Sequence, residues 1–103
     1  MDVSEECRAT GSLIKCIQYQ SILYISGVGE MKNFTLKTLP WYFPEEIQNI
    51  EIENGVSTIG TFAFYGFHQL KGVIVPQSLK MIGSSAFSNC ISLESIIWYY
   101  NTK

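Results

Sequence analysis

Apolar and polar positions recur with a fixed spacing over the second half of the chain. Two similar hexapeptides, IGTFAF at residues 59–64 and IGSSAF at residues 82–87, stand 23 residues apart. The same offset relates apolar residues on either side of them, in three sets: Ile47, Leu70 and Leu93; Ile50, Val73 and Ile96; Ile52, Val75 and Trp98. A sequence period in the twenties is typical of a solenoid, in which each unit forms one coil stacked on the next.

The apolar-x-apolar triplet in each unit predicts a short β-strand. Because side chains alternate between the two faces of a strand, the apolar pair points inward and the residue between points outward. The expected inward residues are Ile50, Ile52, Val73, Val75, Ile96 and Trp98, and the outward ones are Glu51, Ile74 and Ile97. The Asn54-Gly55 pair and Pro76 are expected to end the first two strands where the chain bends.

The repeated hexapeptide predicts the corner of each coil. Its glycine is expected to let the backbone turn tightly, and its alanine to lie where neighbouring coils are closest. Phe64 and Phe87 would fill the space between coils, which Phe67 or Cys90 would close from the far side. We expect replacement of either Phe64 or Phe87 by alanine to cost about 3 to 5 kcal/mol.

Upstream of residue 46 the 23-residue register is lost. Two alternating segments, IKCIQYQ at residues 14–20 and SILYISGVGEM at residues 21–31, predict a hairpin. The segment LPWYFPEE, residues 39–46, is bracketed by prolines and predicts an irregular, aromatic-anchored connection. We therefore expect a tail at 1–6, an N-terminal β cap at 7–46, and repeats at 47–69, 70–92 and, in part, 93–103.

Residues 75–96, VPQSLKMIGSSAFSNCISLESI, resemble the repeat unit of the BspA-like leucine-rich repeat proteins, and residues 52–73 resemble it more loosely. In that family, segments similar to LYISGVGEM and PWY often precede the first repeat, and both stand here in that order. The resemblance implies a mainly β leucine-rich repeat solenoid with short helical turns, a short parallel sheet and a hairpin-like cap. It also implies a surface antigen that works in protein–protein interaction, adhesion or scaffolding, and it carries over no catalytic residue.

Composition and charge restrict the partners. The chain has 103 residues, of which 47% are apolar and 16% charged, and its net charge is −2. These values are typical of one globular domain, and the lack of a basic stripe argues against nucleic acid. No apolar run is long enough to span a bilayer, and the first residues, MDVSEE, do not resemble a signal peptide. The family resemblance indicates the cell surface or secretion, whereas the missing signal leaves an intracellular location open.

Residues that could carry chemistry are few. Cys7, Cys16 and Cys90 show no metal-binding spacing, so reduced thiols are expected, with a Cys7–Cys16 disulfide as the alternative in an exported protein. His68 is the single histidine and is expected on the surface. Neither an activated nucleophile pair nor a phosphate-binding loop is present. We therefore expect no enzyme activity, no cofactor and no metal site.

The candidate functional residues lie on the outward side of the strands and at the last strand. They are Glu51, Glu53, Ile74, Pro76, Ile97, Trp98, Tyr99 and Tyr100. Exposed apolar groups beside carboxylates favour a protein contact. The final segment, IIWYYNTK, begins a strand without the corner that should follow, so its open edge is expected to self-associate or to dock onto a larger protein. The sequence predicts a binding or adhesion module or, alternatively, a structural subunit built into an assembly through this edge.

Overall fold

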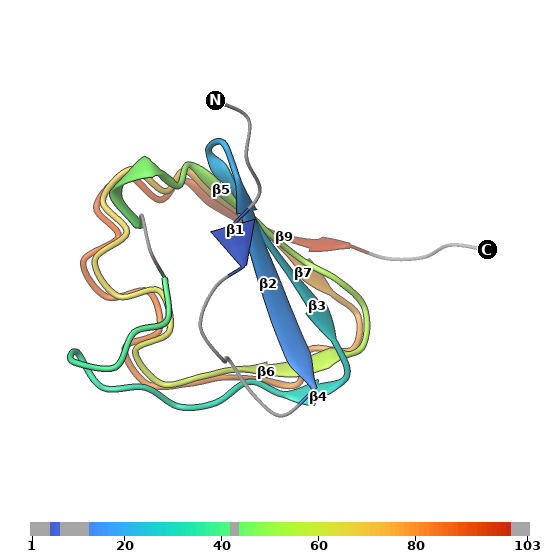
Figure 1. Ribbon diagram of the computed structural model, residues 1–103. Coiled ribbons are helices and arrows are strands. Elements are labelled where there is room, and N and C mark those ends of the chain that lie inside the picture. The colour runs from blue at the N-terminus through green and yellow to red at the C-terminus, as the bar shows by residue number, and fades with distance from the viewer. Residues whose placement is uncertain (1–4, 7–12, 42–43, 100–103) are drawn as a thin grey trace.

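The computed structural model describes the backbone of residues 5–6 and the whole of residues 13–41 and 44–99. They form a solenoid whose successive coils overlie one another in a view along its axis (Figure 1). The strands are β1 (Glu5–Glu6), β2 (Ile14–Tyr19), β3 (Ile22–Gly27), β4 (Gly29–Glu30), β5 (Asn49–Ile52), β6 (Val56–Ile59), β7 (Gly72–Pro76), β8 (Met81–Ile82) and β9 (Ser95–Tyr99). A 3-10 helix of one turn, η1 (Pro44–Glu46), lies between β4 and β5. The predicted mainly β solenoid is confirmed.

Two sheets form two sides of the coils. The larger sheet has the strand order β1-β2-β3-β5-β7-β9, and the smaller has β4-β6-β8. Strand β2 pairs antiparallel with β1 and β3, and the remaining neighbours pair in parallel. The predicted hairpin is therefore present, and its tight turn places Gln20 in the left-handed region, with φ of 54°. Its second strand, β3, also begins the parallel sheet.

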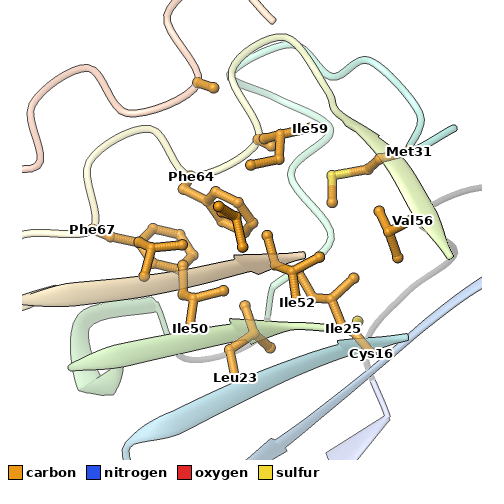
Figure 2. Close-up of a cluster of buried hydrophobic side chains, with 14 of the residues drawn as sticks. Cys16, Leu23, Ile25, Met31, Ile50, Ile52, Val56, Ile59, Phe64 and Phe67 are labelled. Carbon is orange, nitrogen blue, oxygen red and sulfur yellow. The ribbon is translucent and has the colours of Figure 1, made fainter. Parts of the chain in front are cut away.

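The core lies between the larger sheet and the rest of each coil. Inward side chains of the sheet, among them Leu23, Ile25 and Ile50, are fully buried. Figure 2 shows these side chains facing Phe64 and Phe67, which come from the corner of the second coil. Burying an aliphatic or aromatic side chain of this kind contributes roughly 1.5 to 3 kcal/mol, so this contact between the sheet and the corners stabilises the coil.

The first coil is longer than the others. Leu23 on β3 pairs with Ile50, 27 residues further on, whereas Ile50 pairs with Val73 after 23 residues. The extra residues form a turn between Phe34 and Trp41, closed by a hydrogen bond of 3.1 Å from the Thr38 backbone N–H to the Thr35 carbonyl. The predicted loss of the 23-residue register is therefore present, but it falls at Trp41 rather than at residue 46. The 23-residue offset holds from Trp41 onward, and an insertion hides it before that point.

Three aromatic rings, one from each coil, stack along the solenoid axis. The Trp41 and Phe64 ring centroids are 5.3 Å apart at an interplanar angle of 22°, and those of Phe64 and Phe87 are 5.4 Å apart at 30°. These residues stand 23 positions apart in the sequence. The Trp41 indole N–H also donates to the Ala63 carbonyl, so the first ring is fixed in orientation. We call this stack the aromatic ladder; it joins the cap to the repeats.

The hexapeptide glycines are needed for close packing rather than for a special backbone conformation. A Cβ on Gly60 would lie 1.8 Å from the Lys32 carbonyl oxygen, and one on Gly83 would lie 2.5 Å from the Thr61 backbone nitrogen. Neither glycine has a positive φ. The left-handed residues are instead Phe62 and Ser85 (φ of 60° and 57°) and Gly66 and Asn89 (φ of 76° and 63°). The sequence predicts that these glycines allow a tight backbone turn, and this is wrong. Glycine is required because the backbone of the neighbouring coil occupies the space that a side chain would need.

Candidate functional site

One row of outward-facing side chains crosses five strands of the larger sheet. Strand register places Ile17 opposite Tyr24, Tyr24 opposite Glu51, Glu51 opposite Ile74, and Ile74 opposite Ile97. We call these five residues the outward row. They lie on the face away from the core, because the alternate residues of the same strands, such as Leu23 and Ile50, are buried.

The outward row is mainly apolar and accessible. The exposed fractions of Ile17, Ile74 and Ile97 are 43%, 37% and 54%. Tyr24 and Glu51 are half-buried, so the carboxylate of Glu51 lies between apolar neighbours near the centre of the sheet. Exposed apolar groups around one charged group make a surface suited to contact with another protein.

The sequence-predicted residues are distributed unevenly over this face. Glu51, Ile74 and Ile97 lie side by side, and Glu53 and Tyr99 are exposed near them. Pro76 pairs with Tyr99 but is buried, so its predicted place on the exposed surface is wrong. Tyr100 lies outside the described residues.

Sequence reasoning missed the part of the row that comes from the hairpin. The sequence places Ile17 and Tyr24 in a cap. Because β3 pairs in parallel with β5, however, the outward face of the sheet extends over both β3 and β2. Tyr19, 38% exposed, lies on the same face at the hairpin turn. The usable signal is the alternation in β2, whose exposed positions include two large apolar residues where polar ones are usual.

Strand β9 pairs with β7 on one side, and none of the residues that the structure describes pairs with its other side. All five residues of β9 are exposed, including Ile96 at 38% and Trp98 at 45%. The equivalent residues one coil earlier, Val73 and Val75, are fully buried. Ile96 and Trp98 keep the predicted inward register, since they pair with Val73 and Val75, but they are exposed because a neighbouring coil on both sides is what completes burial.

Cysteine and histidine side chains show little sign of chemistry. Cys16 is disulfide-bonded, so the expectation of reduced thiols is wrong for it, and Cys7 lies outside the described residues. Cys90 is free, and its thiol donates to the Phe64 carbonyl at 3.1 Å. Burial raises the pKa of the Cys90 thiol, an effect that a backbone hydrogen bond from Phe67 opposes. His68 is exposed, and no cluster of metal-ligating side chains occurs among the residues that the structure describes.

A shallow groove of about 390 Å³ follows the smaller sheet. Its lining repeats from coil to coil, with Met31, Ile59 and Ile82 at related positions. Polar groups along it are already paired, since the Thr61 N–H donates to the Asn33 side-chain oxygen at 2.9 Å. The groove is therefore a product of coil stacking, and Glu30 is the one charged residue among the described residues that line it.

A parallel strand in every coil, with a stacked corner behind it, defines a leucine-rich repeat solenoid. The chain belongs to the BspA-type leucine-rich repeat family: the family model described as BspA type leucine rich repeat region (6 copies) matches residues 41–103. The match begins at Trp41, the residue from which the 23-residue spacing holds. Repeats of this family typically bind proteins, and the fold is generally a non-enzymatic scaffold.

Among solved structures, the chain is similar to a leucine-rich repeat protein from Eubacterium ventriosum. The TM-score is 0.86 at 26% sequence identity, and the likeness covers 93% of this chain and 26% of that one. The chain thus spans about a quarter of the length of that protein. None of the curated proteins matches the chain. In the part of the chain that the structure describes, no helix is long and apolar enough to cross a membrane.

Proposed function

We propose that the chain is a non-enzymatic protein-binding module of the adhesion type, which holds its partner across the outward row. The observation that carries this proposal is the register that aligns Ile17, Tyr24, Glu51, Ile74 and Ile97 across one sheet. A rigid sheet keeps these side chains in fixed positions, so a partner loses little of its binding free energy to ordering this surface.

The chemistry of the row indicates the kind of partner. Aliphatic and tyrosine side chains contribute apolar contact area, and Glu51 is the carboxylate among them. A partner segment with apolar side chains around one lysine or arginine would complement this arrangement, because a half-buried carboxylate requires a counter-charge when water is removed. Glu53, exposed beside the row, favours the same positive partner.

Export to a cell surface is the setting that we propose for this activity. The disulfide at Cys16 supports it, because disulfides persist in oxidising compartments and are rare in the cytosol. The membership of the BspA-type family supports it as well, since the sequence resembles surface antigens of that family.

The proposed binding can be tested with selected peptides. A displayed library of random peptides is selected on the full chain, and the affinity of the recovered peptides is then measured on variants. Ile74→Asp should weaken binding at least about tenfold, the loss expected when an interface anchor is replaced. Leu36→Asp is the matched control, because Leu36 is 54% exposed but lies in the turn of the first coil, off the larger sheet.

Either of two results contradicts the proposal. If the peptides bind Ile74→Asp and the unchanged chain with equal affinity, the binding surface lies elsewhere. Equal loss of affinity in Leu36→Asp would mean that the effect is not specific to the row. Enrichment of basic residues among the recovered peptides, together with loss of affinity in Glu51→Gln, would support the predicted partner charge.

A second candidate function is that of a structural subunit held in a larger assembly by its last strand. The exposure of all five residues of β9 favours it, since an unpaired strand edge is a template for further pairing. The first function uses the outward face of the sheet and the second uses the edge of β9, and Ile97 belongs to both.

A further inference from the structure

The two edges of the larger sheet are built differently. At one edge, β2 is covered in part by β1, a two-residue strand made of Glu5 and Glu6. At the other edge, β9 has the sequence SIIWY, with no charge and no proline. Proteins usually protect edge strands with charged residues, proline or bulges. The β9 edge lacks these protections, whereas the opposite edge ends in a strand of only two residues.

The side of the described coils next to β9 is also apolar. Large apolar side chains of the last coil are exposed there: Met81 at 63%, Ile82 at 41% and Ile91 at 80%. The aromatic ladder ends at Phe87, which has Phe64 on one side and is only partly buried. The hairpin end differs, because Trp41 is 5% exposed and Leu23 is fully buried.

We propose that two copies of this chain pair through β9, antiparallel and around a two-fold axis at Ile97. This inference rests on the second candidate function, the open edge as an assembly contact, and is argued from the edge of β9 rather than from partner binding, although Ile97 also belongs to the outward row. In this pairing Ile97 faces itself, Ile96 faces Trp98 of the second copy, and Ser95 faces Tyr99. Each cross-strand pair is apolar or neutral, so the edge is complementary to itself.

The closed hairpin end favours a second copy in this orientation. Head-to-tail stacking requires one open end and one receptive end, and would give an unlimited filament. Here β2 and the covering β1 occupy the other edge, and the core side chains beneath them are already buried. Pairing of β9 with β9 of a second copy buries exposed apolar surface on both copies. It also gives a closed dimer, because no further copy can be added.

The proposed pairing also extends the outward row. A two-fold axis perpendicular to the sheet keeps both outward faces on the same side. Ile97 of one copy then lies next to Ile97 of the other, and the two outward rows become adjacent. The two rows would then form one surface twice as long, with a Glu51 carboxylate at two symmetrical positions. Two linked binding surfaces raise the overall affinity for a multivalent partner without any new contact.

The test uses the full 103-residue chain in size exclusion with light scattering over a range of concentrations. The unchanged chain should show twice its mass of 11.7 kDa. Ile97→Lys and Ile97→Glu, each alone, should show a twofold fall in mass, because like charges face each other across the axis. An equal mixture of the two variants should return to twice the chain mass. Ile74→Lys, on the same face one strand inward, is the control and should remain dimeric.

A second pair of variants keeps the test informative if a change at Ile97 prevents folding, which circular dichroism would reveal. Ser95→Lys combined with Tyr99→Lys should be monomeric, whereas Ser95→Lys combined with Tyr99→Glu should be dimeric, because residue 95 faces residue 99. Any of three results overturns the inference: an unchanged chain that is monomeric at every concentration, a mass that grows beyond the dimer, or a charge mixture that stays monomeric. Loss of peptide binding in Ile74→Asp tests the outward row separately, so the two failures are distinguishable.

Discussion

The two ends of this short solenoid carry the same repeat pattern but bury it to different extents. At the hairpin end, Leu23 and Ile25 are fully buried under the sheet. At the β9 end, Ile96 and Trp98 occupy the equivalent positions and are 38% and 45% exposed. The comparison teaches that a repeat does not bury its own apolar residues. Burial comes from a neighbour on each side, and the hairpin serves as that neighbour at one end.

The largest expected difference between the two ends is in the aromatic ladder. Phe64→Ala should lower the free energy of unfolding by about 3 to 5 kcal/mol, because Phe64 is fully buried between two stacked rings. Phe87→Ala should cost about 1 to 2 kcal/mol, since Phe87 is half-buried and stacks on one side only. The measurement is urea unfolding followed by circular dichroism.

This expectation differs from the equal cost that the sequence predicts for the two phenylalanines, because Phe64 is fully buried and Phe87 is half-buried. Trp41→Phe is a useful companion variant, because it keeps an aromatic ring in the ladder but removes the hydrogen bond to the Ala63 carbonyl. Equal costs for Phe64→Ala and Phe87→Ala would contradict the comparison and would indicate that Phe87 is covered in solution.

A smaller difference is expected at the glycines that separate the coils. Gly60→Ala should cost about 2 to 3 kcal/mol, because the new methyl group meets the Lys32 backbone inside the stack. Gly83→Ala should cost about 1 to 2 kcal/mol, since the last coil has room to shift outward. Thermal unfolding at fixed protein concentration measures both.

Gly72→Ala is the matched control for these glycines. A Cβ at Gly72 would be 3.1 Å from the Asn49 side-chain oxygen and 3.6 Å from the Ser95 hydroxyl oxygen, both movable groups. The change should leave stability within about 0.5 kcal/mol or raise it slightly, because alanine restricts the unfolded chain. A large loss in this variant would show that the close approach at Gly60 is not the cause of its effect.

The smallest expected effect concerns Cys90, which stands at the open end where Phe67 stands one coil earlier. Burial raises the pKa of its thiol above the ordinary value of 9.0. The folded state therefore holds the proton more tightly, and the stability that the protonated thiol contributes is present below pH 9 and is lost as pH rises through the raised pKa. Urea unfolding at about pH 8 and about pH 10 measures this loss.

Cys90→Ser is the reference for the pH experiment. Serine keeps a hydroxyl that can donate to the Phe64 carbonyl and does not ionise in this range. The difference in unfolding free energy between the unchanged chain and Cys90→Ser should therefore shift against the unchanged chain as pH rises. A difference that stays constant with pH would show that the thiol is as accessible in the folded state as in the unfolded state.

Much of the fold could be predicted because one physical requirement repeats. Apolar residues at a constant offset indicate coils, and the strand triplets and the Asn54-Gly55 turn follow from local rules. The hexapeptide alanine and phenylalanine were placed correctly between coils, since small and large residues alternate in a packed core. The glycine was misread because the sequence cannot show that the Lys32 carbonyl, nearly thirty residues earlier, occupies the space of its side chain.

The candidate site was predictable only in the middle of the sheet. Stacking at a constant offset brings Glu51, Ile74 and Ile97 together without further knowledge. Ile17 and Tyr24 required the pairing of β3 with β5, which the insertion in the first coil hides from a search for period 23. Pro76 shows the opposite error, because a strand pattern alone does not reveal that this last residue of β7 is buried.

The similar length of the coils has a consequence for how the chain folds. The Gln48 N–H donates to the Ser21 carbonyl at 2.8 Å, and the Lys71 and Glu94 N–H groups donate one coil back in the same way. Each such bond closes a loop of nearly the same length, so the entropy cost of adding a coil does not grow along the chain. Folding is then expected to spread from the hairpin one coil at a time, and backbone amides of β9 should exchange with solvent long before those of β5.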